Sequence, residues 1–380
     1  MFLPLIAIPL MLQAQRPDSA VLLTRLGTDT LAVERVVRTA SRVDADVVLR
    51  SPATTRTRYQ LTLAPDGGMQ ELRAETITPG GDAAAVRREH YRRDGDTVRV
   101  RITTGDRVQE RAVPAAGPVL PFIDMVHWPL DLAFQRLTAG GGSGGDQLLL
   151  TGTRITPFPM RRTGPDSGTL THPSRGTMRA RISAAGVLLG LDAGATTRKL
   201  TVERRPWMEV DALAERWAAA DRAGRGVGAL SGRGRATGAI AGASLLVDYG
   251  TPVRRGREIW GALVPYGQVW RTGANEATHF TTDRALVLGR GADTLRVPAG
   301  TWTLFSIPEA DGGVLIVNRQ TGQTGTAYDA ARDLGRVRMS VRALAEPVET
   351  FTIAVVPGGA LELWWDRRAF VIPVAVPPAP

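Results

Sequence analysis

The sequence predicts an all-β protein with two β-rich regions. Short segments rich in Val, Leu, Thr and Arg alternate apolar and polar residues, which is the period of half-buried strands. Turn signals separate these segments, as at 65–68 (PDGG), 79–82 (PGGD) and 93–96 (RDGD). No regular alternation of strand and helix occurs, so parallel βαβ units are not expected. The length of 380 residues exceeds that of a usual single domain, so two domains are expected.

The first region, residues 15–205, has the rhythm of an antiparallel meander and is expected to form a curved sheet or half-barrel. Examples of its expected strands are 43–49, 56–63, 97–103 and 176–182. Residues 120–137 (LPFIDMVHWPLDLAFQRL) interrupt the rhythm and are helical in part, with breaks at Pro121 and Pro129. This segment either plugs the open side of the sheet or lines a pocket with His127 and Trp128.

A helix and a linker are expected between the two regions, over residues 206–242. Pro206 opens the helix, and Val210, Leu213, Trp217 and Ala220 recur at the spacing of one helical face. Residues 223–242 (AGRGVGALSGRGRATGAIAG) have little capacity to bury a core, which predicts a flexible linker.

The second region, residues 243–375, is expected to be a β-sandwich or jelly roll. About ten short strands with intervening turn residues support this expectation. The expected strands are 244–248, 277–282, 285–288, 294–297, 301–307, 314–318, 336–341, 350–356, 361–365 and 369–374.

Composition narrows the function classes. The net charge is +10, but the cations are scattered and almost all are arginine, so nucleic-acid binding is not expected. The absence of cysteine from the sequence excludes disulfides, thiolate metal sites and a thiol nucleophile. The histidines lack the spacing of a metal site, and there is no G-x-S-x-G motif, so neither a metal nor a cofactor is expected. The four histidines are His90, His127, His172 and His279.

Residues 1–14 (MFLPLIAIPLMLQA) form an apolar run that ends in Ala14. The run is too short to span a bilayer and has the length of a signal-peptide core, so no transmembrane segment is expected. It predicts export to the periplasm or to the outside of the cell. The alternative is a buried N-terminal strand.

The candidate site is the stretch 265–276 (PYGQVWRTGANE). Arg271 offers a planar two-pronged grip on a carboxylate or phosphate, and Trp270 can stack on a ring or cation. Asn275 donates and accepts hydrogen bonds, while Glu276 accepts them. The expected walls of this polar ligand site are Tyr249, Trp260 and Tyr266.

A structural alternative explains the same residues without a ligand. Neighbours in a strand point to opposite faces, so Trp270 and Arg271 cannot both face one pocket without a bulge. In this alternative Trp270 belongs to the core, Arg271 and Glu276 form a buried ion pair, and Asn275 holds the turn through its own backbone.

The second region resembles the bacterial family called domain of unknown function 2911. The matching stretches are, in order, LLVDYGTPVRRGREIWGALVPYGQVWRTGANEATHFT, PAGTWTLFSIP, NRQTGQTGTAYD, EPVETFTI and LWWDRRAFVIPV. The resemblance implies an exported all-β domain and brings no assigned chemistry. The chain departs from the family's usual pattern after Asn318, where Arg319 and small residues replace a lysine and an aromatic. The first 240 residues are loosely similar to the half-barrel carriers of lipoproteins and lipids in bacterial envelopes.

The expected function is non-catalytic binding of a small polar or amphipathic ligand, or of a surface partner, in the bacterial envelope. The N-terminal half-barrel would supply an apolar cavity and the second domain a polar site. One alternative is a carboxylate-dependent hydrolase of a glycan or ester, in which Asp248 or Asp329 pairs with Glu276. Another is a structural scaffold. The sequence leaves the oligomeric state open.

Overall fold

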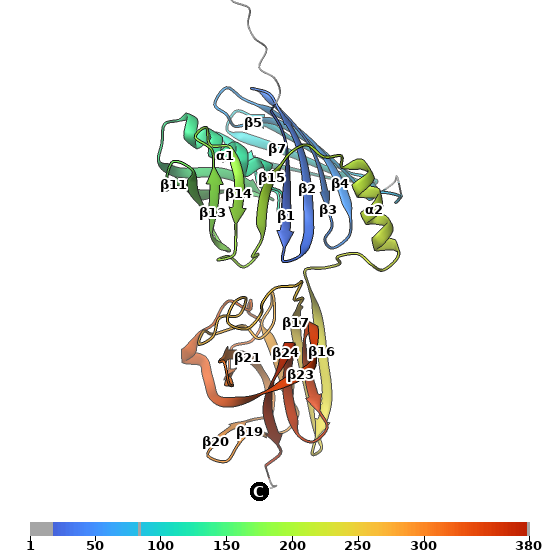
Figure 1. The fold of residues 1–380 in the computed structure, drawn as a ribbon, viewed down its shortest axis with the longest axis vertical. Helices are drawn as coiled ribbons and strands as arrows, with labels where there is room; N and C mark the ends of the chain where they lie inside the picture. The colour runs from blue at the N-terminus through green and yellow to red at the C-terminus, as the bar shows by residue number, and fades with distance from the viewer. Residues whose placement is uncertain (1–17, 83–84, 378–380) are drawn as a thin grey trace, which may run out of the picture. The chain divides into compact units, whose positions relative to one another are not determined.

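The computed structural model describes residues 18–82 and 85–377. They belong to two compact units, Met1–Gly228 and Ala229–Pro380, called unit 1 and unit 2 below (Figure 1). The expected leader at 1–14 lies outside the described residues. Within the described part of the chain, no helix has the length and the apolar run needed to cross a bilayer.

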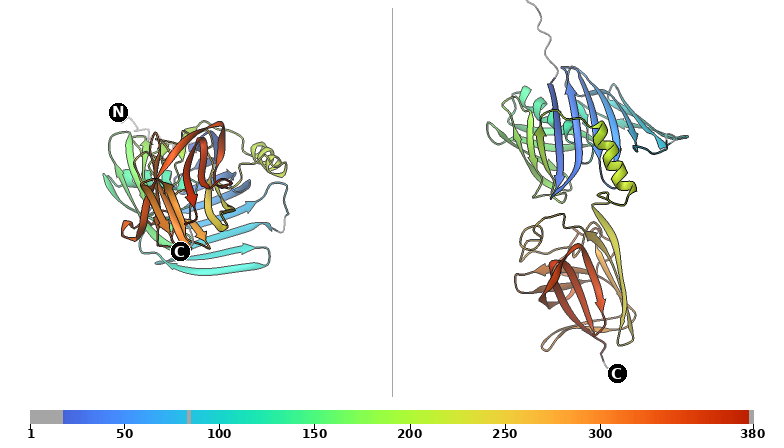
Figure 2. Two further views of the ribbon diagram at one scale, coloured as in Figure 1. Left: turned by 90° about the horizontal axis from the view of Figure 1, so that it is seen from below. Right: turned by 45° about the vertical axis from the view of Figure 1, so that its right-hand side comes forward.

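Unit 1 is built on one curved sheet of 15 strands, in the order β8-β7-β6-β5-β4-β3-β2-β1-β15-β14-β13-β12-β11-β10-β9 (Figures 1 and 2). All neighbouring strands are antiparallel except β9 and β10. The expected curved antiparallel sheet is therefore confirmed. The strands are β1 Asp18–Leu26, β2 Asp29–Arg38, β3 Arg42–Leu49, β4 Thr55–Leu63, β5 Met69–Ile77, β6 Arg87–Asp94, β7 Thr97–Thr104, β8 Arg107–Pro114, β9 Val119–Pro121, β10 Gly144–Thr151, β11 Arg154–Arg162, β12 Ser167–His172, β13 Gly176–Ile182, β14 Leu188–Asp192 and β15 Thr201–Arg205.

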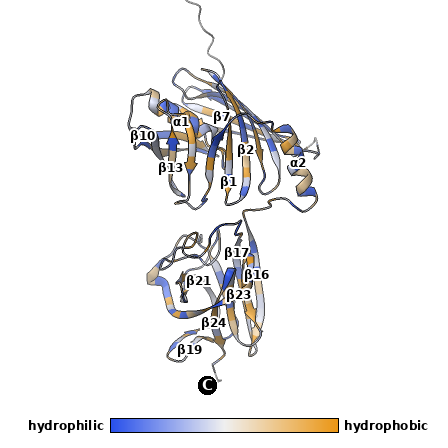
Figure 3. Ribbon diagram, viewed as in Figure 1, coloured by the Kyte–Doolittle hydropathy of each residue, from blue (hydrophilic) through white to orange (hydrophobic). Residues whose placement is uncertain are grey.

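The inner face of this sheet is filled by helix α1, Trp128–Ala139. Hydrophobic and hydrophilic residues alternate along the strands, so one face of the sheet is apolar (Figure 3). Trp128 and Phe134 are buried, and the Trp128 ring lies 5.8 Å from that of Tyr59 on β4. The segment thus packs as a plug. His127 also lines a cavity, but its volume is only about 20 Å³, which is room for little more than one water.

A buried carboxylate receives the start of α1. Glu34 on β2 is fully buried and accepts hydrogen bonds from the backbone N–H groups of His127, at 2.8 Å, and Trp128, at 2.9 Å. His127 is the N-cap residue of α1, and its own side chain makes no cap hydrogen bond. Glu34 therefore supplies the acceptor and the negative charge that a helix N-terminus favours.

Helix α2, Asp211–Arg222, covers part of the outer face of the same sheet. Val210, Leu213 and Ala214 pack on Val21, Val33 and Val48, which project from β1, β2 and β3. The sequence predicts that Pro206 opens the helix, but the helix begins at residue 211 and its N-cap is Val210. The residues before it are held by side-chain contacts with the outer face of the sheet, described below.

Unit 2 is a nine-stranded antiparallel sheet in the order β16-β17-β18-β21-β22-β23-β24-β19-β20. Register shifts between Ala343 and Thr352 bend the long strand β23, as β-bulges do. The core includes side chains from both ends of this order, such as Ile240 on β16 and Val297 on β20. The elements are β16 Ser231–Ile240, β17 Ala243–Pro252, β18 Thr278–Thr282, β19 Leu286–Arg290, β20 Asp293–Val297, β21 Gly300–Pro308, β22 Gly313–Asn318, the 3-10 helix η2 Ala330–Arg332, β23 Asp333–Val356 and β24 Ala360–Ala375.

The segment expected to be a flexible linker contains strand β16. Its glycines lie where a side chain would collide: a Cβ on Gly234 would be 2.7 Å from the Tyr249 ring, and one on Gly238 would be 2.6 Å from Val355. Small residues here permit close packing against larger neighbours, and this is why the segment seemed unable to join a core. The units divide after Gly228, and two expected pairs of short strands, 336–341 with 350–356 and 361–365 with 369–374, are the continuous strands β23 and β24.

Candidate functional site

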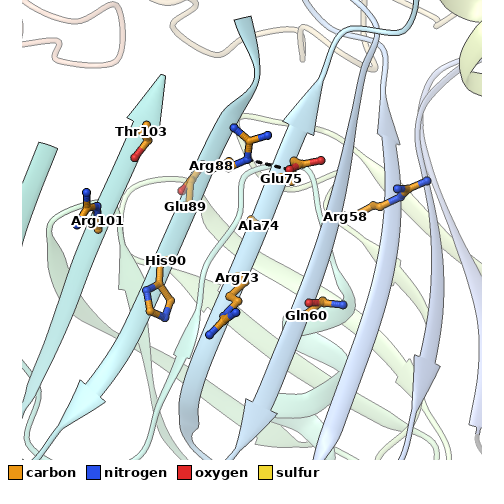
Figure 4. A pocket seen from close by; sticks show the side chains of 10 residues that line it. All are labelled: Arg58, Gln60, Arg73, Ala74, Glu75, Arg88, Glu89, His90, Arg101 and Thr103. Carbon is orange, nitrogen blue, oxygen red and sulfur yellow. Dashed lines mark hydrogen bonds and ion pairs between the residues drawn. The ribbon is translucent and has the colours of Figure 1, made fainter. Parts of the chain in front are cut away.

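An open groove of about 600 Å³ crosses strands β4 to β7 on the outer face of unit 1. Figure 4 shows side chains from these four neighbouring strands projecting around it. A volume in this range is typical of small-molecule sites, but this lining is polar where such sites are usually apolar. The lining residues are Arg58, Gln60, Arg73, Ala74, Glu75, Arg88, Glu89, His90, Arg101 and Thr103.

Strand register arranges most of this lining in two parallel rows. Side chains of directly opposed residues lie on the same face of a sheet, about 5 Å apart. One row reads Arg58, Glu75, Arg88 and Thr103 from β4 to β7. The other row reads Gln60, Arg73, His90 and Arg101. The pairing of the strands therefore brings four arginines from four strands to one surface.

Positive charge dominates the groove. Four arginines line it, against the two carboxylates of Glu75 and Glu89. Glu89 already accepts hydrogen bonds from Arg87 Nε, at 2.8 Å, and from the Tyr91 hydroxyl. Beyond the lining, Glu71 pairs with Arg73 and Glu110 with Arg101 at 3.2 Å, so the arginines outnumber the carboxylates only within the groove itself.

The ion pairs at the groove are exposed and exchangeable. Arg88 Nε lies 2.9 Å from Glu75 Oε2, and Arg73 lies 3.0 Å from Glu71 Oε1. The side chains of the two arginines are 62% and 64% exposed. Exposed pairs of this kind contribute about 0–1 kcal/mol, so a ligand anion can replace a protein carboxylate at little cost.

His90 belongs to the same network. Its Nε2 lies 2.6 Å from Glu71 Oε1. The hydrogen bond with His90, followed by that with Arg73, lowers the pKa of Glu71 below its usual value. Glu71 therefore stays ionised and holds both Arg73 and His90 on the outer face.

Unit 2 contains the turn at 265–276, and its aromatic residues form core. The Trp270 ring stacks on that of Trp365 at 6.0 Å and meets those of Trp260 at 5.8 Å and Phe351 at 5.0 Å. The Tyr249 ring lies 5.8 Å from that of Phe351. Edge-to-face and offset contacts at these separations stabilise aromatic clusters. Trp260, Trp270 and Tyr249, expected to line a ligand site, are thus brought together by packing against one another.

The polar residues of the turn do not form the expected buried ion pair. Asn275 and Glu276 are exposed, and Arg271 is half-buried. No hydrogen bond or ion pair of Arg271 falls within residues 18–82 and 85–377, Glu276 included. Asn275 has a positive φ of 61°, which asparagine tolerates better than most residues. Tyr266 is partly buried against the core of unit 2, and the Arg368 guanidinium lies 5.8 Å from the centroid of its ring.

Arg271 is held in place by its stem. A Cβ on Gly325 would lie 2.7 Å from Arg271 Cδ, so the arginine side chain passes directly over the glycine backbone. The Gly325 N–H donates to the carbonyl of Asn275 at 2.8 Å and fixes the two loops together. Burial lowers the pKa of Arg271 below its usual value. The guanidinium is therefore partly desolvated, and it makes no ion pair with Glu276 within the described residues.

Two carboxylates considered as partners of Glu276 have other contacts. Asp248 forms an ion pair with Arg233, and Asp329 accepts a hydrogen bond from Ala331 N at 3.0 Å as the N-cap of η2. His279 Nε2 accepts a hydrogen bond from the Gly322 N–H at 2.9 Å. In the described ranges, no group of three or more His, Asp or Glu side chains is placed to hold a metal ion.

A family model matches a segment of the chain within unit 2. Residues 231–374 match the family described as Protein of unknown function (DUF2911). The DUF2911 segment holds the entire aromatic cluster, with Trp260, Trp270, Phe351 and Trp365. The sequence stretches that carry the resemblance to DUF2911 are thus largely stretches that build its core.

The other comparisons concern structures and curated proteins. The chain is similar to a DUF1089 family protein from Pseudomonas aeruginosa, with 15% sequence identity and a TM-score of 0.32. The match covers 43% of this chain and 90% of that one. No curated protein matches the chain.

The groove residues escaped the sequence analysis, although a signal for them exists. Arg58, Arg73, Arg88 and Arg101 occur at nearly even spacing along a region with the rhythm of hairpins. Whether evenly spaced residues on successive hairpins reach one level of a sheet depends on the length of each turn. The sequence alone does not give these lengths. The DUF2911 boundary near residue 231 gives no help, because the groove lies in unit 1.

Proposed function

We propose that the protein binds a small anionic ligand, bearing carboxylate or phosphate groups, in the groove across β4 to β7. The observation that carries this proposal is a set of four arginines on two adjacent cross-strand rows, which line a groove of about 600 Å³. A guanidinium is planar and presents paired donors that match carboxylate and phosphate geometry. Several such groups on one rigid sheet favour a ligand with more than one negative group.

The surrounding contacts support reversible binding. Arg73 and Arg88 are paired with exposed carboxylates, which hold the guanidinium groups over the groove without burying them. Binding would exchange these weak pairs for charge-assisted hydrogen bonds to the ligand. The rigid strands beneath limit the conformational entropy that binding removes.

This proposal keeps the polar ligand expected from the sequence and moves it to unit 1. It also keeps the expected export, so that the binding protein acts in the periplasm or outside the cell. Arg271 offers a single guanidinium, whereas the groove offers four, and this difference favours the groove as the primary site.

The proposal is tested by calorimetric titration of the full chain with citrate and with pyrophosphate, at low salt and at 0.15 M NaCl. We expect saturable binding that weakens with salt, because exposed charges are screened. The double variant Arg73→Ala and Arg88→Ala should bind at least about tenfold more weakly, a loss of about 1.4 kcal/mol.

A matched control removes the same charge elsewhere on unit 1. Arg154 on β11 and Arg179 on β13 are exposed, and their replacement by alanine should leave affinity within about twofold, because neither lines the groove. An equal loss in both double variants would show non-specific attraction by net charge and would overturn the proposal. So would a wild-type chain that binds neither anion.

A further inference from the structure

A second hollow, of about 300 Å³, adjoins the groove on the outer face of unit 1. Both are lined by Arg58 and Gln60, so they share a wall on β4. The second hollow extends toward β3 and β2 and includes the tryptophan that precedes α2. Its other lining residues are Arg35, Val37, Asp44, Ala45, Asp46, Tyr59 and Trp207.

The two cross-strand rows continue through this hollow. Arg58 is opposed by Asp46 and then by Arg35, while Gln60 is opposed by Asp44. Six strands, β2 to β7, therefore lie beneath the groove and this adjoining hollow, which together are called the trough. At about 4.8 Å between neighbouring strands, the trough is on the order of 24 Å across. Such a span suits an elongated ligand better than a single small anion.

Trp207 supplies an exposed aromatic surface at one end of this trough. Trp207 is 47% exposed, which is unusual for tryptophan. The Arg35 guanidinium lies over the indole at 5.1 Å from its centroid, and the indole Nε1–H donates to Glu209 Oε1 at 3.2 Å. These two contacts fix the ring before any ligand arrives, which lowers the entropic cost of stacking on it.

Hydroxyl-binding groups lie between the tryptophan and the arginines. Asp44 is paired only with the exposed Arg42, at 2.7 Å, within the described residues, and its side chain is 46% exposed. Gln60 is exposed and offers both a donor and an acceptor. Asp46 differs: burial raises its pKa, but hydrogen bonding and charge from Arg56, with Arg35 nearby, outweigh this and lower it overall. Asp46 is thus committed to protein cations, and Asp44 is the carboxylate available to a ligand.

We infer that the ligand is an acidic oligosaccharide, an inference that rests on the proposed anion-binding function of the groove. The apolar face of a sugar ring stacks on Trp207, and ring hydroxyls meet Asp44 and Gln60. The acid groups lie over Arg73, Arg88 and Arg101. The order of these groups across the sheet, aromatic then hydroxyl-binding then cationic, matches a polymer of sugar rings that carry acid groups.

An acidic peptide would pair with the arginines equally well, but it does not account for the exposed ring of Trp207 or for Asp44. A sugar-ring hydroxyl can donate to Asp44, whereas a glutamate carboxylate offers no donor there. The saccharide therefore accounts for the whole trough, and the peptide accounts for only one end.

The test compares four probes by calorimetric titration of the full chain: tetragalacturonate, its methyl ester, hexaglutamate and citrate. We expect tetragalacturonate to bind at least tenfold more tightly than the other three. Trp207→Ala should weaken tetragalacturonate at least tenfold and leave citrate within twofold. The control Met208→Ala, at an exposed neighbour, should leave both unchanged.

The outcomes separate the two proposals. Citrate binding with no preference for tetragalacturonate, or with no effect of Trp207→Ala, would overturn the saccharide inference and leave the anion site standing. Hexaglutamate that matches tetragalacturonate would assign the trough to acidic polymers in general and would also overturn the saccharide. If the methyl ester bound as tightly as the acid, the arginines would not be recognising the acid groups, and the saccharide inference would be overturned. If none of these probes and no pyrophosphate binds, both proposals fail.

Discussion

The turn at 265–276 of unit 2 and the groove of unit 1 use the same kinds of residue in opposite ways. In the turn, Trp270 is partly buried and packs against the core, and Arg271 is half-buried without a partner in the described chain. At the groove and its adjoining hollow, Trp207 and the arginines are exposed and loosely paired. A conspicuous local motif therefore marks a packing unit, while the surface suited to a ligand is assembled from unremarkable residues on separate strands.

The largest expected effect is on the two tryptophans. Trp270→Ala should lower the free energy of unfolding of unit 2 by about 3–5 kcal/mol, because it removes a ring that contacts three other aromatic side chains. Trp207→Ala should change the stability of unit 1 by less than about 0.5 kcal/mol. Urea titration followed by circular dichroism measures both. Similar losses of stability in the two variants would contradict the assignment of Trp270 to packing and of Trp207 to the surface.

A smaller effect concerns pH at the loop beside the turn. Burial, and next the charge of Arg233, lower the pKa of His279 below its ordinary value near 6.5, although Asp248 and Glu276 oppose this. The unfolded state then binds the proton more readily, so stability is full above pH 6.5 and falls as pH decreases below it. The loss should be about 1 kcal/mol, since protonation also removes the hydrogen bond from Gly322.

Urea titrations of wild type and of His279→Gln, at pH 7.5 and pH 5.5, measure this dependence. The variant should lose the His279 contribution while keeping an acceptor for Gly322. His90→Gln, in the exposed network of unit 1, serves as the control and should leave the stability of unit 2 unchanged at both pH values. An unaltered pH dependence in His279→Gln would assign the effect to other groups.

The smallest expected effect is at Arg271. Arg271→Met keeps the stem over Gly325 and removes a partly desolvated charge that lacks a carboxylate partner in the described residues. The free energy of unfolding should stay level or rise by up to about 1 kcal/mol. Arg338→Met, which removes an exposed pair with Glu309, should change it by less than about 0.5 kcal/mol. A marked loss of stability in Arg271→Met would mean that the guanidinium has a stabilising partner. The turn would then hold a paired arginine, as the groove does.

Much of the fold could be predicted from the sequence because alternation and turn residues are local signals. The expected strand at 56–63 is β4, and the segment with Pro121 and Pro129 does contain a helix that fills the sheet. Strand β16 could not be recognised, because the reason for its glycines is a pair of distant neighbours, Tyr249 and Val355. Contacts of that kind exist only after the chain has folded.

The candidate site was less predictable for the same reason. Arg271, Asn275 and Glu276 are close in sequence, yet the structure makes no ion pair between Arg271 and Glu276 within its described residues. Arg73 and Arg88 are far apart in sequence and lie on adjacent strands. Proximity along a turn is a poor guide to shared function, whereas hairpin register, which turn lengths set, decides which side chains face one ligand.

The order of strands in unit 1 also bears on how the groove forms. Strands β4 to β7 are consecutive in sequence and in the sheet, so residues 55–104 contain the whole arginine surface. In contrast, β1 must find β15 across most of the unit, a pairing with a far larger loop-closure cost. We expect the β4–β7 surface to form early in folding and the β1–β15 seam late. The ligand surface is then formed by one local segment of the chain. Substitutions in this segment can alter the chemistry of the surface without disturbing the pairing of β1 with β15.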